Sequence, residues 1–191
     1  MKAPFIIVGI IVLTLVTGLF ARGLHLVGVQ QGYSPEQPIA FPHKVHAGDN
    51  KIPCLYCHSA ARTSRHAGIP SNNVCMNCHS MLEKQTVEIE KLQEAAQEKR
   101  AISWVKVHNL PDFVYFNHSQ HVLSGVACQR CHGPVEQMTR LEQTAPLTMG
   151  WCIECHRHNA HLPASGFERA ALSLSGEPKP SPGLDCASCH Y

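Results

Sequence analysis

The sequence is poor in the residues from which an ordinary protein core is built. Aromatic residues make up 6% of its 191 residues and charged residues 16%, whereas glycine and proline number 13 each. Aromatic side chains supply much of the apolar area that stabilises a fold, and glycine and proline interrupt helices and strands. The core would therefore be poor without cofactors. After its N-terminal segment the chain has about 165 residues, the length of one domain.

No cysteine lies outside one motif, Cys-x-x-Cys-His, which occurs five times. In chain order, motifs 1 to 5 are Cys54, Cys57 and His58; Cys75, Cys78 and His79; Cys128, Cys131 and His132; Cys152, Cys155 and His156; Cys186, Cys189 and His190. Two thiols at this spacing can add to the vinyl groups of one porphyrin, and the adjoining histidine can ligate its iron. Disulfides or zinc sites would also use paired cysteines, but they do not explain the histidines. The motifs predict five covalently bound c-type haems, with ten thioether cysteines and five proximal iron ligands.

The formal net charge of the chain is +2. Five haems would add up to ten propionate charges and bring the net charge to about −8, which argues against nucleic-acid binding. Many of the lysines and arginines are expected to pair with propionates. Buried porphyrin would replace the missing apolar surface. We therefore expect a mostly irregular and α-helical multihaem domain that collapses without its haem.

An uncharged apolar stretch of 19 residues runs from Ala3 to Ala21, between Lys2 and Arg22. As a helix it would span roughly 28 Å, close to the hydrocarbon thickness of a membrane. A cleavable signal peptide has a shorter apolar region and a small residue where this chain has Leu19. We expect an uncleaved transmembrane signal-anchor helix within residues 1–24 and a haem domain over residues 25–191, with cleavage as the alternative.

The attachment of haem to cysteine indicates the compartment. Attachment requires reduced thiols and, in bacteria, takes place on the outer side of the cytoplasmic membrane. We therefore expect a single-pass protein of the cytoplasmic (inner) membrane, with its haem domain on the periplasmic side. Lys2 at the inner end of the helix agrees with this orientation.

A duplication divides the haem domain. The segment Phe41-Pro42-His43-Lys44-Val45-His46 precedes motif 1, and Phe116-Asn117-His118-Ser119-Gln120-His121 precedes motif 3. The offset is 75 residues for these segments, 74 for the haem motif that follows and 77 for the next one. Two dihaem units, about 41–79 and 116–156, are therefore predicted, followed by a fifth haem at 186–190.

Two segments connect these parts. Ser80 to Lys99 lacks glycine and proline and places apolar residues at helical spacing, which predicts a linking helix over about 80–100. A partner-docking role is possible for this helix, but a solvated face explains it better. Residues 162–185 are rich in proline and predict an extended strap.

Irons that only carry electrons need a sixth ligand each. Outside the motifs there are nine further histidines, which exceed the five that are needed: His25, His43, His46, His66, His108, His118, His121, His158 and His161. The strongest distal candidates are the repeated pairs, His43 with His46 and His118 with His121. Three residues apart, the two rings of a pair can serve two different haems.

The fifth distal ligand is contested between Met149, His66 and His108. A thioether from Met149 would make one haem His/Met and raise its potential. A core methionine is an equal alternative for Met149, and a structural or propionate-binding role for the two histidines. His25, His158, His161 and Met81 are weaker candidates.

The Phe-x-His-x-x-His segment before a haem motif resembles class III and c7 cytochromes. In those proteins the first histidine ligates the nearest haem and the second another haem. The resemblance implies that His43 serves the haem of His58 and that His118 serves the haem of His132. It leaves the partners of His46 and His121 open.

With its anchor, five motifs and connecting phrases, the chain resembles the pentahaem cytochrome c subunit of bacterial alternative complex III. The most specific stretches are 41–48, 66–70, 107–121, 133–136 and 147–156. The resemblance implies an electron-transfer subunit of a respiratory or photosynthetic quinol:acceptor oxidoreductase, without a catalytic site of its own. Its implied partners are an iron–sulfur/molybdopterin-like subunit, integral membrane subunits, and a monohaem cytochrome c or terminal oxidase as acceptor.

Two other functions compete with this one. A multihaem quinol dehydrogenase of the NapC/NrfH type also combines one N-terminal helix with a short multihaem domain, and it oxidises quinol itself. A catalytic haem reductase would need an open iron position, and the surplus of histidines argues against one.

Overall fold

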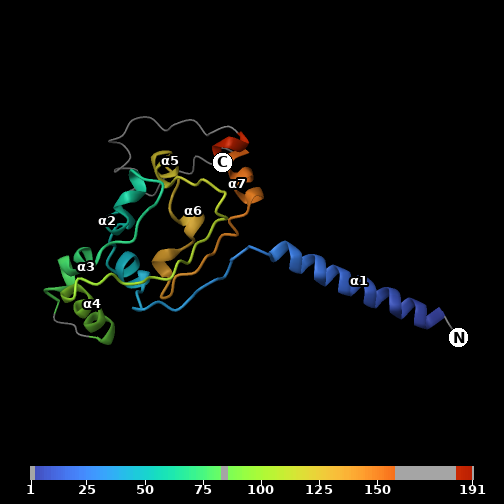
Figure 1. The fold of residues 1–191 in the computed structure, drawn as a ribbon, viewed down its shortest axis with the longest axis horizontal. Helices are drawn as coiled ribbons and strands as arrows, with labels where there is room; N and C mark the ends of the chain where they lie inside the picture. The colour runs from blue at the N-terminus through green and yellow to red at the C-terminus, as the bar shows by residue number, and fades with distance from the viewer. Residues whose placement is uncertain (1–2, 83–85, 158–183, 191) are drawn as a thin grey trace. The chain divides into compact units, whose positions relative to one another are not determined.

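The computed structural model describes residues 3–82, 86–157 and 184–190. The chain divides into two compact units, Met1–Gln30 and Gln31–Tyr191. The first unit contains the helix α1 (Ala3–Leu26), drawn in blue in Figure 1. Its segment Pro4–Gly23 is long and apolar enough to cross a membrane, and none of it is buried. The expected N-terminal apolar helix is therefore present, and its length and composition suit an anchor or a signal sequence.

The second unit is built from short helical pieces joined by irregular chain (Figure 1). In chain order these are η1 (Lys44–Asp49), α2 (Cys54–Cys57), η2 (Ser59–Arg62), α3 (Asn72–His79), α4 (Val87–Gln97), α5 (His118–Leu123), α6 (Gln129–His132), η3 (Val135–Gln137), α7 (Met149–Arg157) and η4 (Cys186–Ser188). Within the described ranges there is no β-strand, only an isolated antiparallel bridge between Val114 and His190. The expectation of a mostly irregular and α-helical domain is confirmed.

Few apolar side chains are buried in this unit. Among the described residues those of the core are Ala61, Leu92, Ala95, Val107 and Ala145. Three of the five are alanines, and they bury little area compared with leucine or phenylalanine. The polypeptide alone therefore has too small an apolar core for its length, as the composition predicts.

The two dihaem units predicted from the sequence, here unit 1 (about 41–79) and unit 2 (about 116–156), pack in a crossed manner. η1, from the start of unit 1, packs against η3, which follows motif 3 in unit 2. In return α5, from the start of unit 2, packs against η2, which follows motif 1 in unit 1. A Cβ at Gly48 would collide with the backbone carbonyl of Glu136, so glycine permits the close approach of η1 and η3.

Matching hydrogen bonds hold the two crossings. The Lys44 amide donates to the Met138 carbonyl at 2.9 Å, and the Ser119 amide donates to the Ser64 carbonyl at 3.2 Å. Lys44 and Ser119 occupy corresponding positions of the repeat, as do Ser64 and Met138. The crossing is therefore reciprocal, and each unit supports the histidine segment of the other.

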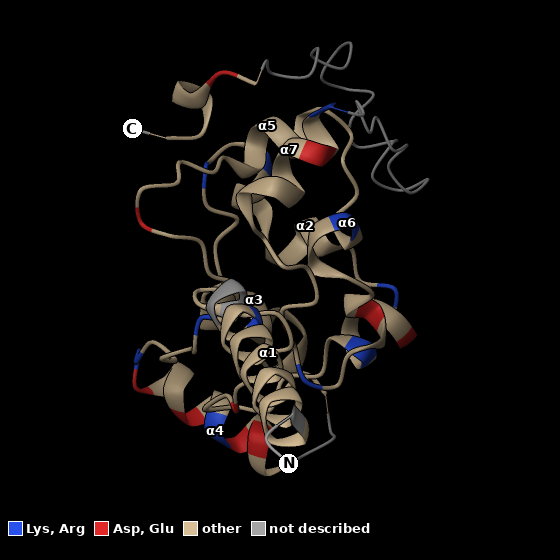
Figure 2. Cartoon of the chain, turned by 90° about the vertical axis from the view of Figure 1, so that its right-hand side faces the viewer, with Lys and Arg blue, Asp and Glu red and all other residues tan. Residues whose placement is uncertain are grey.

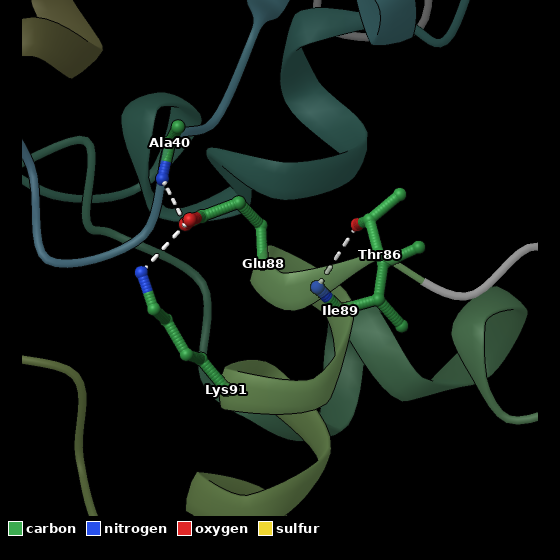
Figure 3. Close-up of polar contacts among 5 residues, drawn as sticks. All are labelled: Ala40, Thr86, Glu88, Ile89 and Lys91. Atoms are coloured by element: carbon green, nitrogen blue, oxygen red, sulfur yellow. Dashed lines mark hydrogen bonds and ion pairs between the residues drawn. The ribbon is translucent and has the colours of Figure 1, made fainter.

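α4 is shorter than the linking helix expected over about 80–100. Thr86 caps its N-terminus by accepting a hydrogen bond from the Ile89 amide at 3.3 Å (Figure 3). Glu88 accepts from the Ala40 amide at 2.7 Å and pairs with Lys91 at 2.8 Å. Acidic residues recur along this helix (Figure 2), and α4 packs against α3.

The expected strap over 162–185 lies almost wholly outside the described residues, together with His158 and His161.

Candidate haem-binding site

Every Cys-x-x-Cys-His motif folds as a helical turn. In motifs 1, 3 and 5 the histidine amide donates to the carbonyl of the first cysteine, four residues back. These distances are 2.9 Å for His58 to Cys54, 3.0 Å for His132 to Cys128 and 2.9 Å for His190 to Cys186. Motifs 2 and 4 lie within α3 and α7. Because residues three apart share one face of a helix, both thiols of a motif can reach the same side of one porphyrin.

Burial raises the pKa of Cys131 to about 11, and the neighbouring thiols of Cys155 and Cys152 add to this shift. Burial also raises the pKa of Cys57 and Cys75. Redox-active and metal-binding cysteines show the opposite shift. Within residues 3–82, 86–157 and 184–190 no three histidine, cysteine or acidic side chains converge to hold a metal ion.

The two Phe-x-His-x-x-His segments have the same internal geometry. In each, the phenylalanine ring packs edge-on against the first histidine and nearly parallel to the second. The centroid separations are 4.9 Å for Phe41–His43, 4.2 Å for Phe41–His46, 4.8 Å for Phe116–His118 and 4.5 Å for Phe116–His121. The phenylalanine therefore fixes how the two imidazoles point relative to one another.

Three distal candidates face a motif histidine at a characteristic spacing. The ring centroids are 6.1 Å apart for His46–His79, 6.0 Å for His121–His156 and 6.3 Å for His118–His132. With a metal–nitrogen bond of about 2.0 Å and about 1.1 Å from nitrogen to ring centre, two imidazoles on opposite sides of one metal have centroids about 6.2 Å apart. The spacing therefore fits bis-imidazole ligation, and it pairs His46 with motif 2 and His121 with motif 4.

The fourth pair is His43 with His58, whose rings interact electrostatically. Burial lowers the pKa of His43 to about 4, with His58 and then His46 contributing. Burial likewise lowers the pKa of His132 to about 3, with His108 and His118 as the nearest contributors. These rings are therefore neutral at pH 7, which is the form that ligates a metal.

Most of the site histidines direct Nδ1 at a backbone carbonyl. The acceptors and distances are Pro42 for His46 (3.0 Å), Gly68 for His58 (2.6 Å), Arg65 for His118 (2.8 Å), Asn117 for His121 (2.9 Å) and Phe113 for His190 (3.4 Å). A ring that donates through Nδ1 carries its lone pair on Nε2, and this bond is the usual second contact of a metal-bound histidine. The side chains are thus oriented to hold iron through Nε2.

His108, one of the contested ligands, contacts a motif histidine instead of a carbonyl. Its Nε2 lies 3.2 Å from Nδ1 of His132, and the two rings meet edge to face with centroids 4.3 Å apart. His108 therefore lies on the Nδ1 side of His132, whereas His118 faces that ring at the ligand spacing.

The other two contested residues are Met149 and His66. Met149 begins α7 one turn before Cys152, and its side chain is 66% exposed. Cys152 interacts electrostatically with Cys189. His66 follows Arg65, whose guanidinium lies 4.5 Å over the ring of Tyr115.

Tyr115 connects the His66 region to motif 5, because its amide donates to the Cys189 carbonyl at 2.7 Å. Cys152 and Tyr115 therefore link the segments of Met149 and His66 to the fifth motif.

The motifs follow one another in space in an order that differs from the sequence. Cys57 of motif 1 interacts with Cys75 of motif 2. His132 of motif 3 interacts with His58 of motif 1. Motif 3 then neighbours motif 4 through Cys131, and motif 4 neighbours motif 5 through Cys152. Through these neighbours the motifs are linked in the order 2, 1, 3, 4, 5.

Sequence reasoning missed Gln143, whose side chain is 1% exposed. Its Oε1 accepts a hydrogen bond from the Asn109 amide at 3.1 Å, and its backbone pairs with Gly32 and Tyr33. This side chain holds the segment that carries His108. No sequence pattern marks it, because a single glutamine between polar residues has many surface explanations.

Comparison with known proteins agrees with this site. Residues 114–191 match the family model described as cytochrome c7 and related cytochrome c. The chain is also 31% identical over 160 residues to the protein named menaquinone reductase, multiheme cytochrome c subunit, from Nitratidesulfovibrio vulgaris strain Hildenborough. That match covers 72% of this chain and 75% of the relative.

These matches confirm the expectation of covalently bound c-type haem and of a role in electron transport. The chain belongs to the multihaem c-type cytochromes related to cytochrome c7.

Proposed function

We propose that this protein is a membrane-anchored pentahaem electron-transfer subunit of a quinol:acceptor oxidoreductase in the respiratory or photosynthetic chain. The observation that carries the proposal is that neighbouring cysteines and histidines link all five motifs, in the order 2, 1, 3, 4, 5. A row of linked redox centres suits transfer between two partners. A catalytic centre would instead need one open iron.

The proposed ligand sets follow the facing rings. His43 pairs with His58, His46 with His79, His118 with His132, and His121 with His156. When bound, haem supplies reversible one-electron chemistry at its iron. The protein supplies two neutral imidazoles at each of these four positions, and the Nδ1 contacts of His46, His58, His118, His121 and His132 limit the rotation of these rings. Held in this way, the ligands exchange slowly and favour electron transfer over substrate binding.

For the fifth site, His190 is the proximal ligand in the proposal, and the distal ligand is Met149 or His66. The segments of Met149 and His66 are linked to motif 5 through Cys152 and Tyr115, as described above. A His/Met pair would give this iron a higher potential than the others. Separate Met149→Leu and His66→Leu variants distinguish the two, because only loss of the true ligand makes one iron five-coordinate.

The proposed location is the cytoplasmic (inner) membrane, with the haem domain on the periplasmic side. The 20-residue span Pro4–Gly23, with a mean hydropathy of 2.5, supports an anchor. The proposed partners are an iron–sulfur/molybdopterin-like subunit, integral membrane subunits, and a monohaem cytochrome c or terminal oxidase. The resemblance to the pentahaem subunit of alternative complex III supports this set.

A second candidate function reverses the direction of electron flow. The relative from N. vulgaris is named as a subunit of a menaquinone reductase. By that analogy the chain would carry electrons toward membrane menaquinone. The same row of motifs serves either direction, so the row favours neither.

The test uses the complex purified from its native membrane. A pyridine haemochrome assay should give five haems per copy of this chain, and a lower number would refute the central proposal. The complex is then mixed with a menaquinol analogue or, separately, with a reduced monohaem cytochrome. Haem reduction by the quinol with turnover to the acceptor supports the first candidate, and net menaquinone reduction supports the second. Quinol oxidation by the isolated subunit would favour the NapC/NrfH type.

A further inference from the structure

Motifs 1 and 3 are the inner motifs, because they lie between motifs 2 and 4 in the order given above. Their proximal histidines have different contacts. Nδ1 of His58 lies 2.6 Å from the Gly68 carbonyl, whereas Nδ1 of His132 lies 3.2 Å from Nε2 of His108. Among the ring hydrogen bonds of the described site histidines, this is the one whose partner is another side chain. A contact that differs between two otherwise corresponding sites is a candidate for tuning one of them.

The tautomers follow from ligation. If His132 binds iron through Nε2, its neutral ring carries its proton on Nδ1 and must donate to His108. Nε2 of His108 then accepts, and the proton of His108 lies on Nδ1. We propose that His108 is a positioning residue that accepts this hydrogen bond and lowers the reduction potential of the haem held by His132. The inference rests on the proposed role of His132 as an iron ligand.

The position of His108 is fixed from both sides in the sequence. Val107 is 5% exposed and anchors the segment in the core. The Asn109 amide donates to Oε1 of the buried Gln143. Nζ of Lys106 donates to Oδ1 of Asn109 at 3.0 Å. His108 is therefore held between two immobilised residues.

The chain on the His132 side is equally constrained. Gly133 has a φ of +72°, and a Cβ at this position would collide with the side chain of Thr144. Thr144 is the neighbour of Gln143 in sequence. The turn that follows His132 thus packs on the same segment that holds His108, which fixes the two rings relative to one another.

The direction of the effect follows from hydrogen-bond strength. An imidazole nitrogen is a stronger proton acceptor than an amide carbonyl, so it draws the Nδ1 proton further from His132. The ligand becomes more basic and stabilises the ferric iron more than the ferrous iron. We therefore expect the haem of motif 3 to have a lower potential than it would have with a carbonyl acceptor such as Gly68.

The experiment is a spectroelectrochemical titration of the haem-loaded, full-length protein. His108→Phe keeps a ring in the contact and removes the acceptor, so one midpoint potential should shift upward while the others stay in place. His108→Gln retains an acceptor oxygen and should shift that potential less. Ser103→Phe, which adds a ring at an exposed position of the same segment, is the matched control. Haem content and the low-spin electron paramagnetic resonance signals should be unchanged in all three.

Two results would overturn the inference. If the Phe and Gln variants of His108 titrate alike, or neither shifts a potential, His108 does not act through its acceptor nitrogen. If His108→Phe produces a five-coordinate haem that binds carbon monoxide, His108 is an iron ligand instead. A wild-type count below five haems would refute the proposed function, whereas a full count with unshifted potentials refutes only the role of His108.

Discussion

Motifs 2 and 4, the outer motifs of the two dihaem units, are held in almost the same way, whereas motifs 1 and 3, the inner motifs, are not. His46 faces His79 at 6.1 Å and 51°, and His121 faces His156 at 6.0 Å and 52°. The Nδ1 contacts of His46 and His121 go to equivalent carbonyls, four residues back. This half of each unit has kept its geometry through the duplication.

The inner motifs have diverged around their histidines. His118 directs Nδ1 at the Arg65 carbonyl, whereas Nδ1 of His43 is buried with no hydrogen-bond partner. The proximal histidines differ too, because Nδ1 of His58 contacts the Gly68 carbonyl and Nδ1 of His132 contacts the imidazole of His108. The inner motifs also lie where the two units cross, so each has neighbours from both units. Local sequence fixes the outer sites, and contacts between units distinguish the inner ones.

The largest expected effect comes from removing the cysteines that attach haem at the inner motif 3, compared with the same change at the terminal motif 2. Cys128→Ser with Cys131→Ser removes the covalent bonds at motif 3, between the two units. Cys75→Ser with Cys78→Ser does the same at motif 2, at one end of the row. Because the polypeptide buries so little apolar area of its own, we expect the motif 3 variant to fail to accumulate as folded holoprotein. The motif 2 variant should accumulate with one haem fewer.

Protein yield and the pyridine haemochrome count per chain measure both outcomes. Equal losses in the two variants would contradict the distinction between inner and outer motifs. A single-cysteine variant, Cys75→Ser, is the control for serine substitution in itself, because one thioether remains.

The next largest effect tests the similarity of the outer sites. His46→Ala and His121→Ala should each leave one iron five-coordinate, since each removes the imidazole that faces one motif histidine. Carbon monoxide difference spectra of the reduced proteins should show about one new binding haem in either variant. A variant that frees two haems, or none, would contradict the pairing of that histidine.

The haem turns and the histidine segments of the outer sites could be predicted from the sequence because they are local, but the facing pairs His46–His79 and His121–His156 could not. The helical turn of Cys-x-x-Cys-His and the Phe-x-His-x-x-His segment each span a few residues, so spacing alone indicates which groups share a face. The reciprocal crossing could not be predicted, because the bonds from Lys44 to Met138 and from Ser119 to Ser64 join residues far apart in sequence.

The position of His108 illustrates the same limit. The residue 75 positions earlier is Tyr33, so the repeat offers no counterpart for His108. Its sequence context permits an iron ligand, a propionate contact or a structural role equally well. Only the fold, through Gln143 and the turn at Gly133, brings it against His132. The absence of a repeat counterpart was the available signal that this histidine serves one unit alone.

A smaller effect concerns the two left-handed glycines beside the inner sites. Gly68 has a φ of +77°, and a methyl group there would meet only the Cβ of Ala60, at an ordinary contact distance of 3.6 Å. Gly133 has a similar φ of +72° but no room beside Thr144. Alanine at φ > 0 costs about 1–2 kcal/mol, and overpacking adds about 1–3 kcal/mol. Gly133→Ala should therefore lower the unfolding free energy more than Gly68→Ala.

Denaturant unfolding of the holoproteins, followed by circular dichroism, measures this difference. The double variant Gly133→Ala with Thr144→Ala removes the colliding atoms and should recover the overpacking part. Equal destabilisation by the two single variants would show that backbone conformation, and not crowding, limits both positions.

The smallest effect lies in α4, which docks on the motif 2 helix α3 of unit 1. Hydrogen bonds from Lys91 and the Ala40 amide hold the pKa of Glu88 below its ordinary value of 4.5. A carboxylate with a lowered folded pKa stabilises the fold above its unfolded pKa and loses this contribution as the pH falls through the folded pKa. Glu88→Gln should therefore flatten the acid side of the stability curve below about pH 4.5. Thr86→Ala removes the cap at a cost of about 1 kcal/mol at every pH. If thermal unfolding at pH 7 and pH 4 showed both variants with the same pH dependence as the wild type, the bond from Ala40 would not contribute to docking α4 on unit 1.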